Sequence, residues 1–250
     1  MWEAGFWGFV GGSALILGAA VGYFVRLPQR LIAGIMAIGS GVLISAVAFD
    51  LMDEAFESGG FPATAAGFVG GALAYTIANI VVSRRGAKHR KRSGSNPDEA
   101  QPDAGSDTGL AIAIGALLDG VPESVVIGTS LLAGGGVGAV TVAAVFLSNV
   151  PEGLSSAAGM KKAGRGPLYI FGVWGGIALA SGLAAMIGYI SLAGASPAAV
   201  AGVTAVAAGA ILAMLVDTMI PEATEAAQEW SGLIAVIGFL IAFALSKLEG

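Results

Sequence analysis

Eight long apolar runs, separated by short polar breaks, restrict what this chain can fold into. Each run is close to the ~20 apolar residues that an α-helix needs to cross a bilayer. Charged residues make up only 12% of the sequence and hydrophobic residues 56%, whereas a soluble domain carries about 25% charged residues. The sequence therefore predicts an all-α polytopic membrane protein with eight transmembrane helices. The predicted spans are 6–25, 31–57, 61–83, 108–133, 137–160, 168–192, 197–226 and 230–247.

One polar insertion interrupts this pattern. Residues 84–107 begin with a basic cluster at 84–92 and continue with Ser, Asn, Pro and acidic residues, a composition typical of a disordered linker. The chain thus divides into transmembrane helices one to three (1–83), a cytoplasmic basic loop (84–107) and helices four to eight (108–250). The N-terminus lacks a basic region and a clear cleavage site, so we expect the first helix to be retained.

Positive charges indicate the orientation. If both termini lie outside, eleven of the 12 Lys and Arg residues fall on inside loops, and only Lys247 lies outside. Inside loops of membrane proteins carry an excess of Lys and Arg. We therefore expect a multi-pass protein of the cell (inner or plasma) membrane with extracytoplasmic N- and C-termini.

The dipeptide Pro-Glu occurs three times inside the apolar runs, at residues 122–123, 151–152 and 221–222. An Asp at the centre of a membrane helix costs about 2.5 kcal/mol or more, and other acids are similarly rare there. A proline in addition frees a backbone carbonyl that needs another partner. The alternative is a structural kink whose Glu is protonated or paired, but the repetition favours a polar site inside the bilayer.

The acids and their neighbours on two consecutive helices have the spacing of a cation site. Residues four apart share a helix face, and two antiparallel helices joined by the turn 134–136 would bring two such faces together. Oxygen ligands suit Mg, Ca and Mn most naturally, with Zn and Fe also accepted. The predicted metal ligands are Asp119, Glu123, Ser148, Asn149 and Glu152.

Further acids lie in spans two and seven. We expect Asp50, Asp53, Glu54, Asp217 and Glu222 to form entry, exit or secondary sites, although solvated acids at helix ends are an alternative interpretation. The segment 50–55 is also similar to 217–223. This similarity predicts an inverted repeat of helices 1–3 and 6–8 in a 3+2+3 arrangement, a common transporter design.

In this order, the motifs resemble those of the ZIP (Zrt-/Irt-like) family of metal transporters. The family pattern His-Asn-x-Pro-Glu-Gly of helix four is matched by 119–124, and the similar pattern of helix five by 148–153. The Ile-Pro-Glu-Ala of helix seven is matched by 220–223. The resemblance covers nearly the whole chain. It implies uptake of divalent metal ions toward the cytoplasm through a site between helices four and five.

The chain departs from the family pattern at three positions. Asp119 and Gly120 stand where the family has His and Asn, and Ala185 stands where a sixth-helix acid is usual. These departures argue against a binuclear site. They also weaken a preference for zinc, because a site that has only oxygen ligands and no imidazole is less selective for zinc. The expected substrate is Zn, Mn, Fe, Co or Cd, with no further cofactor and no enzymatic activity. The expected partners are metal ions, the lipid bilayer and, from the small-residue helix faces, a second copy of the chain as a homodimer, but not nucleic acid.

Other functions use the same residues. The carboxylates could act as proton relays in a carrier of another solute, or the protein could be a non-transporting ZIP-like membrane sensor. An intramembrane aspartyl protease needs paired aspartates, for which Asp50, Asp119 and Asp217 are available. The sequence lacks Gly-x-Gly-Asp, which argues against the protease.

Overall fold

The computed structural model is a bundle of helices and describes residues 1–94, 100–103, 108–132, 139–225 and 229–249. No β-strand occurs in these ranges. The α-helices are α1 (Trp2–Phe24), α2 (Gln29–Ala46), α3 (Met52–Val82), α4 (Gly109–Ser130), α5 (Ala139–Lys162), α6 (Pro167–Leu192), α7 (Pro197–Met214), α8 (Ile220–Glu225) and α9 (Ser231–Glu249). Three π-helical segments extend or join them: η1 (Val47–Leu51), η2 (Ser83–Ala87) and η3 (Leu215–Met219).

Within the described residues, six helical stretches are long and apolar enough to cross a membrane. They are Trp2–Phe24, Gln29–Ala87, Gly109–Ser130, Pro167–Leu192, Pro197–Glu225 and Ser231–Leu248. The all-α fold is confirmed, and the six apolar helices suggest a multi-pass membrane protein. The predicted count of eight spans is not confirmed by this criterion, because Gln29–Ala87 is one helical stretch and α5 is not among the six.

The long stretch Gln29–Ala87 reverses direction near its middle. Gly60 has φ 69° and ψ 168°, a conformation that glycine adopts without the penalty of a Cβ. Tyr75 and Leu43 belong to one hydrophobic cluster, although the ~32 residues between them would span roughly 48 Å of straight helix. The two halves on either side of Gly60 therefore run in opposite directions, and both contribute side chains to this cluster.

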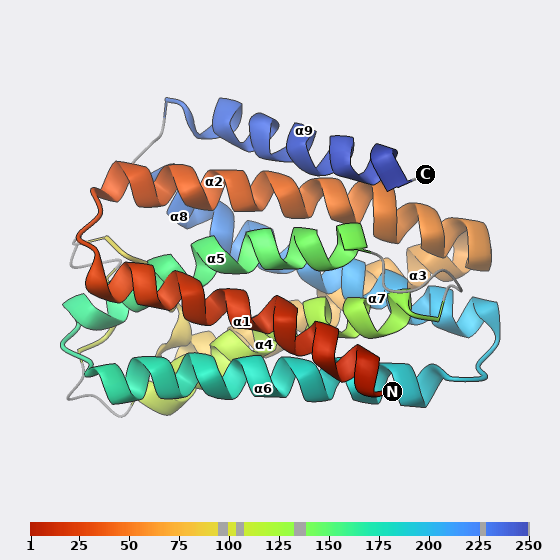
Figure 1. The fold of residues 1–250 in the computed structure, drawn as a ribbon, viewed down its shortest axis with the longest axis horizontal. Coiled ribbons are helices and arrows are strands. Elements are labelled where there is room, and N and C mark those ends of the chain that lie inside the picture. The colour runs from red at the N-terminus through yellow and green to blue at the C-terminus, as the bar shows by residue number, and fades with distance from the viewer. Residues whose placement is uncertain (95–99, 104–107, 133–138, 226–228, 250) are drawn as a thin grey trace.

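The helices lie roughly along the long axis of the bundle, and both termini lie at the same end (Figure 1). α5 occupies the middle, in contact with α1 and α4 on one side and with α2 on the other. Every residue of α5 from Pro151 to Met160 is buried. Glycines allow this close packing: a Cβ at Gly18 or Gly22 of α1 would overlap the backbone of α5.

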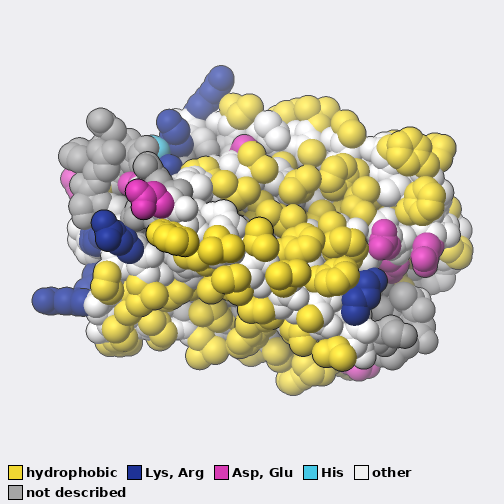
Figure 2. All heavy atoms as spheres, turned by 90° about the horizontal axis from the view of Figure 1, so that it is seen from above, with side chains coloured by type: hydrophobic (Ala, Val, Ile, Leu, Met, Phe, Trp, Pro, Cys, Tyr) yellow, Lys and Arg dark blue, Asp and Glu magenta, His cyan; other side chains and the backbone are white. Residues whose placement is uncertain are grey.

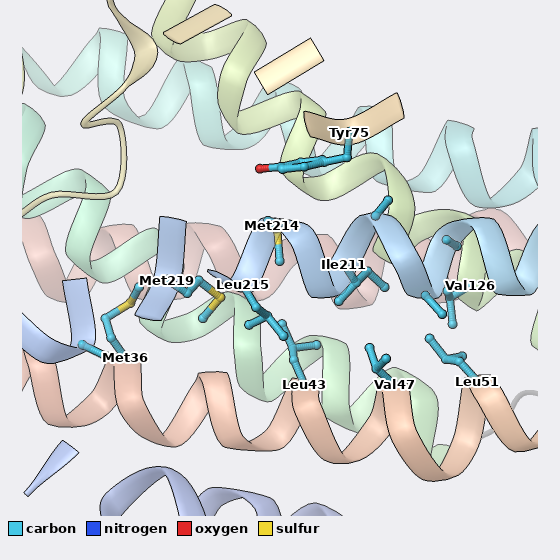
Figure 3. Close-up of a cluster of buried hydrophobic side chains, with 14 of the residues drawn as sticks. Met36, Leu43, Val47, Leu51, Tyr75, Val126, Ile211, Met214, Leu215 and Met219 are labelled. Atoms are coloured by element: carbon cyan, nitrogen blue, oxygen red, sulfur yellow. The ribbon is translucent and has the colours of Figure 1, made fainter. Parts of the chain in front are cut away.

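The largest hydrophobic cluster joins the second and seventh predicted spans. Figure 3 shows Leu43 and Val47 on one side and Ile211 and Leu215 on the other, with Tyr75 of α3 above Met214. The apolar side chains hold η1 next to α7 and η3 next to α2. The ring of Tyr75 is buried in this cluster, which fixes the direction in which its hydroxyl group points.

The surface is dominated by apolar side chains. Figure 2 shows a broad hydrophobic band, with most of the visible Lys and Arg side chains at the end opposite to the termini. Large apolar residues are strongly exposed on several helices, including Leu73, Leu168 and Leu240, and Leu168 is 89% exposed. An exposed apolar surface of this extent is typical of contact with lipid.

Candidate functional site

The structure places all five predicted ligands in the protein interior. Asp119 and Glu123 lie on α4, and Ser148, Asn149 and Glu152 lie on α5. None of the five is more than 3% exposed. Burial of an ionised carboxylate is costly unless a counter-charge or hydrogen-bond donors accompany it.

Arg90 supplies the counter-charge for Asp119. Its Nη2 lies 2.6 Å from Asp119 Oδ1, and its Nε lies 2.8 Å from Oδ2, which makes the pair bidentate. The hydroxyl group of Tyr75 also donates to Asp119 Oδ1 at 2.6 Å and accepts from Arg90 Nη2 at 2.9 Å. Burial lowers the pKa of Arg90, but the charge and hydrogen bonds of Asp119, with Tyr75 and Glu152, give a net rise. Arg90 therefore stays protonated.

Lys91 bridges the carboxylates of the two helices. Its Nζ lies 3.2 Å from Asp119 Oδ2 and 2.9 Å from Glu152 Oε2, and the residue is 3% exposed. Glu123 interacts electrostatically with Glu152, Lys91 and Asp119. Neither oxygen of Glu123 receives a hydrogen bond of ordinary geometry from the part of the chain that the structure describes. The site thus combines three carboxylates with two cationic side chains.

Hydroxyl and amide groups fix the backbone of the basic segment, defined here as Arg90–Ser93. Ser156 Oγ donates to the carbonyl of Arg90 at 2.6 Å, and Ser155 Oγ lies 2.8 Å from the carbonyl of Lys91. Gln101 Nε2 lies 2.9 Å from Arg90 O and 3.1 Å from Arg92 O. The peptide carbonyls of the segment are therefore satisfied inside the bundle, as buried backbone requires.

Two glycines leave room for the segment. A Cβ at Gly159 of α5 would overlap the carbonyl oxygen of Arg92, and one at Gly115 of α4 would lie 2.7 Å from Arg90 Cδ. At either position the added Cβ would come closer to the segment than ordinary van der Waals contact allows. These positions on α4 and α5 allow the segment to pack directly on the two helices that carry the acids.

Glu222, predicted as a secondary site, binds the end of the basic segment. Its Oε1 accepts from the Ser93 backbone N–H at 3.0 Å and from the Ser93 hydroxyl, and Ser155 Oγ lies at 2.7 Å. Arg92 Nη1 lies 2.8 Å from Glu225 Oε2 and 3.1 Å from the carbonyl of Pro221. Residues of α8 thus hold the segment from a second side.

Asp217 is linked to the site through one amide. Asn79 Nδ2 donates to Asp217 Oδ2 at 3.1 Å, and Asn79 Oδ1 accepts from Arg90 Nη1 at 3.0 Å. Asp50 lies elsewhere, where it accepts from Ser246 Oγ at 2.6 Å. Asp53 is exposed and Glu54 half-buried.

Ser148 has its partner outside the carboxylate group, whereas Asn149 contacts both Glu123 and a backbone carbonyl outside the group. Ser148 Oγ donates to Val145 O on its own helix at 2.9 Å, and Asn149 Nδ2 donates to Gly11 O of α1 at 3.1 Å. Among the described side chains, no group of three or more His, Asp or Glu residues is arranged to hold a metal ion. The predicted turn at 134–136 lies outside the described residues.

The sequence did not predict that Arg90, Lys91 and Tyr75 contribute to the site. The composition of 84–107 predicts a disordered cytoplasmic loop, of which residues 95–99 and 104–107 lie outside the described residues, whereas Arg90 and Lys91 are buried. A usable signal existed: acids within the membrane require counter-charges, and 84–92 is the basic cluster that precedes α4 in the sequence.

Comparison with known proteins leaves the family open: no protein-family model and no curated protein matches the chain. The resemblance to the ZIP family stays a prediction from the motifs, and the function is argued below from the site.

Proposed function

We propose that the protein transports divalent metal cations across the membrane, toward the cytoplasm, through the site formed by Asp119 and Glu152. The observation that carries this proposal is the position of the Lys91 ammonium, 3.2 Å and 2.9 Å from the two carboxylates. Two acids on different helices of an apolar bundle bind one cation between them. Intramembrane acids commonly mark ion pathways, and carboxylate oxygens are ligands for Mn, Mg and, less selectively, Zn.

The proposal includes eight membrane crossings with an inverted repeat. α2 and α9 cross at Gly41 and Gly238, where a Cβ on either glycine would overlap a carbonyl of the other helix. α3 and α7 cross in the same way at Gly71 and Gly209. The sequence separation between Gly41 and Gly209 equals that between Gly71 and Gly238 to within one residue. An inverted repeat would relate the crossing of α2 with α9 to the crossing of α7 with α3 by one constant shift in sequence, and this agreement supports the repeat.

The π-helical segments support the same relation. Asp50 lies in η1 and Asp217 in η3, and the two acids have the sequence separation of the paired glycines. π-Bulges are frequent at functional sites. We assign both acids to the ends of the pathway. Asp217 is the better candidate, because Asn79 connects it to Arg90.

Charge supports the orientation. The basic end of the bundle lies opposite to the two termini (Figures 1 and 2). By the positive-inside rule this end faces the cytoplasm, so that both termini are extracytoplasmic. An even number of crossings places the termini on one side, as eight does.

A second candidate function is that of a non-transporting membrane sensor. The bidentate pair of Arg90 with Asp119 favours it, because a permanent pair would block metal binding. The two candidates differ in whether a metal crosses the membrane.

Uptake into proteoliposomes tests transport, with Zn, Mn, Fe, Co, Cd and Mg supplied in parallel. We expect uptake of at least one transition metal, and Glu152→Gln should reduce it strongly because it removes one anionic ligand at nearly constant volume. Glu3→Gln is the matched control, since Glu3 is exposed at the start of α1 and belongs to none of the predicted sites. If no metal accumulates above protein-free liposomes, or if Glu152→Gln transports as well as the wild type, the proposal is wrong.

A further inference from the structure

The basic segment Arg90–Ser93 connects the chain between α3 and α4 to the centre of the proposed cation site. Its Lys91 ammonium lies between Asp119 and Glu152, where a shared metal ion would have to bind. We propose that this segment is a tethered cation that occupies the site in place of the substrate and exchanges with one divalent metal ion. The inference rests on the proposed function, because it takes these carboxylates as the metal ligands.

The two cations exclude each other. Metal ions bind carboxylate oxygens at about 2.0–2.6 Å, within the space that Lys91 Nζ occupies at 2.9–3.2 Å from the same oxygens. Two unit charges 4 Å apart repel by about 4 kcal/mol at an effective dielectric constant of 20, and the repulsion doubles for a divalent ion. Metal binding therefore requires Lys91 to leave.

Exchange of the whole segment, with both Arg90 and Lys91, conserves charge only for a divalent ion. Arg90 and Lys91 together carry two positive charges and pair with two carboxylates, those of Asp119 and Glu152. One divalent cation replaces both side chains without a net change of charge in the buried site. A monovalent cation would leave one buried carboxylate uncompensated, which is strongly unfavourable. The segment thus selects the valence of the substrate.

The attachment of the segment is suited to exchange. Polar groups hold its backbone, namely the hydroxyls of Ser155 and Ser156 and the carboxylate of Glu222. Gly86, at the end of η2, has φ 106°, so the chain turns there in a conformation that favours glycine. Rotation at this position moves the segment without displacing α3, as at other hinges.

Metal-binding calorimetry on the purified full-length protein, with MnCl2 and ZnCl2, tests the exchange. Lys91→Met removes the ammonium but keeps an unbranched side chain. The state in which Lys91 occupies the site competes with metal binding, and it weakens the apparent affinity in proportion to the fraction of protein left free to bind metal. Because Lys91→Met removes this competition, we expect metal binding to tighten by ~10-fold or more. Lys88→Met is the matched control. Lys88 lies three residues before Lys91 and its side chain is exposed, so that this substitution removes the same charge and should leave affinity unchanged.

Gly159→Ala tests the same exchange with every charge in place. Its Cβ would overlap the carbonyl oxygen of Arg92 and displace the segment, so metal binding should also tighten. Gly172→Ala is its control, because a Cβ at Gly172 has no neighbour within 4 Å among the described atoms. Gel filtration and circular dichroism check that each variant folds.

A distance measurement keeps the test independent of these substitutions. The chain has no cysteine, so spin labels at Lys88→Cys and at the exposed Leu168→Cys of α6 report the position of the segment. We expect saturating Zn²⁺ to produce a second, longer distance. The following combination of results overturns the inference. The wild-type protein binds metal through Glu152, neither Lys91→Met nor Gly159→Ala tightens metal binding, and the label distance does not change. Absence of metal binding in the wild type and in Lys91→Met instead refutes the proposed function.

Discussion

The ion pair between Arg90 and Asp119 should couple the loop to the bundle by several kcal/mol. Removing one partner of a buried pair costs about 3–5 kcal/mol, because the other charge stays buried. For Arg90→Met we expect the lower part of this range, since Lys91 Nζ still lies 3.2 Å from Asp119 Oδ2. Asp119→Leu leaves Arg90 and one side of Lys91 without their partner, so the upper part is expected.

The double variant Arg90→Met/Asp119→Leu should lose much less than the sum of the single losses. Apolar replacement of a whole buried pair is often near neutral, so the coupling energy should be about 3 kcal/mol or more. The pair of Arg92 with Glu225 is the control. Its atoms are also 2.8 Å apart, but its side chains are 15% and 18% exposed, so that solvent screens this pair more and its coupling energy should be smaller.

Reversible unfolding in mixed detergent micelles measures these free energies, with circular dichroism as the signal. Additive losses for Arg90 and Asp119, or equal coupling energies for the buried and control pairs, would contradict the structure. Additivity would mean that the basic segment is not docked in the folded protein.

Two further predictions concern packing and selectivity. Gly71→Ala should destabilise the protein, because its Cβ would overlap the carbonyl oxygen of Val206. Gly70→Ala is the control: its Cβ has no neighbour within 4 Å among the described atoms, so it should be neutral or slightly stabilising. Thermal unfolding compares the two variants directly. Asp119→His should shift metal preference toward zinc over manganese, because imidazole is a softer ligand than carboxylate; an unchanged order in competition binding would show that Asp119 does not set selectivity.

Periodicity and hydropathy are sufficient to predict the helical membrane character and the reversal of the chain. The predicted break between 31–57 and 61–83 contains Gly60, where the helix is interrupted. The helical spacing of Asp119, Glu123 and Glu152 also predicted three acids on inward faces, and all three are buried. These features depend on local sequence, which is why a single sequence reveals them.

The partners of the acids could not be predicted in the same way. Hydropathy assigns Arg90 and Lys91 to a polar loop, because burial of a Lys or Arg is unfavourable until a specific carboxylate is placed against it. That carboxylate comes from another helix, and the pairing depends on the space above Gly159. Ser148 was placed by spacing alone, but its hydroxyl bonds to its own helix, as Ser often does within helices.

The reactivity of Lys91 in the native chain tests the central claim most directly. Labelling with an amine-specific reagent, followed by peptide mass spectrometry, compares it with Lys88, which is exposed and three residues away. Without metal, Lys91 should be protected and Lys88 labelled; with a saturating divalent metal, Lys91 labelling should rise while Lys88 labelling stays constant. Equal labelling of both lysines without metal would contradict the placement of Lys91 between Asp119 and Glu152. Continued protection of Lys91 in the metal-bound protein would contradict its exchange with the substrate.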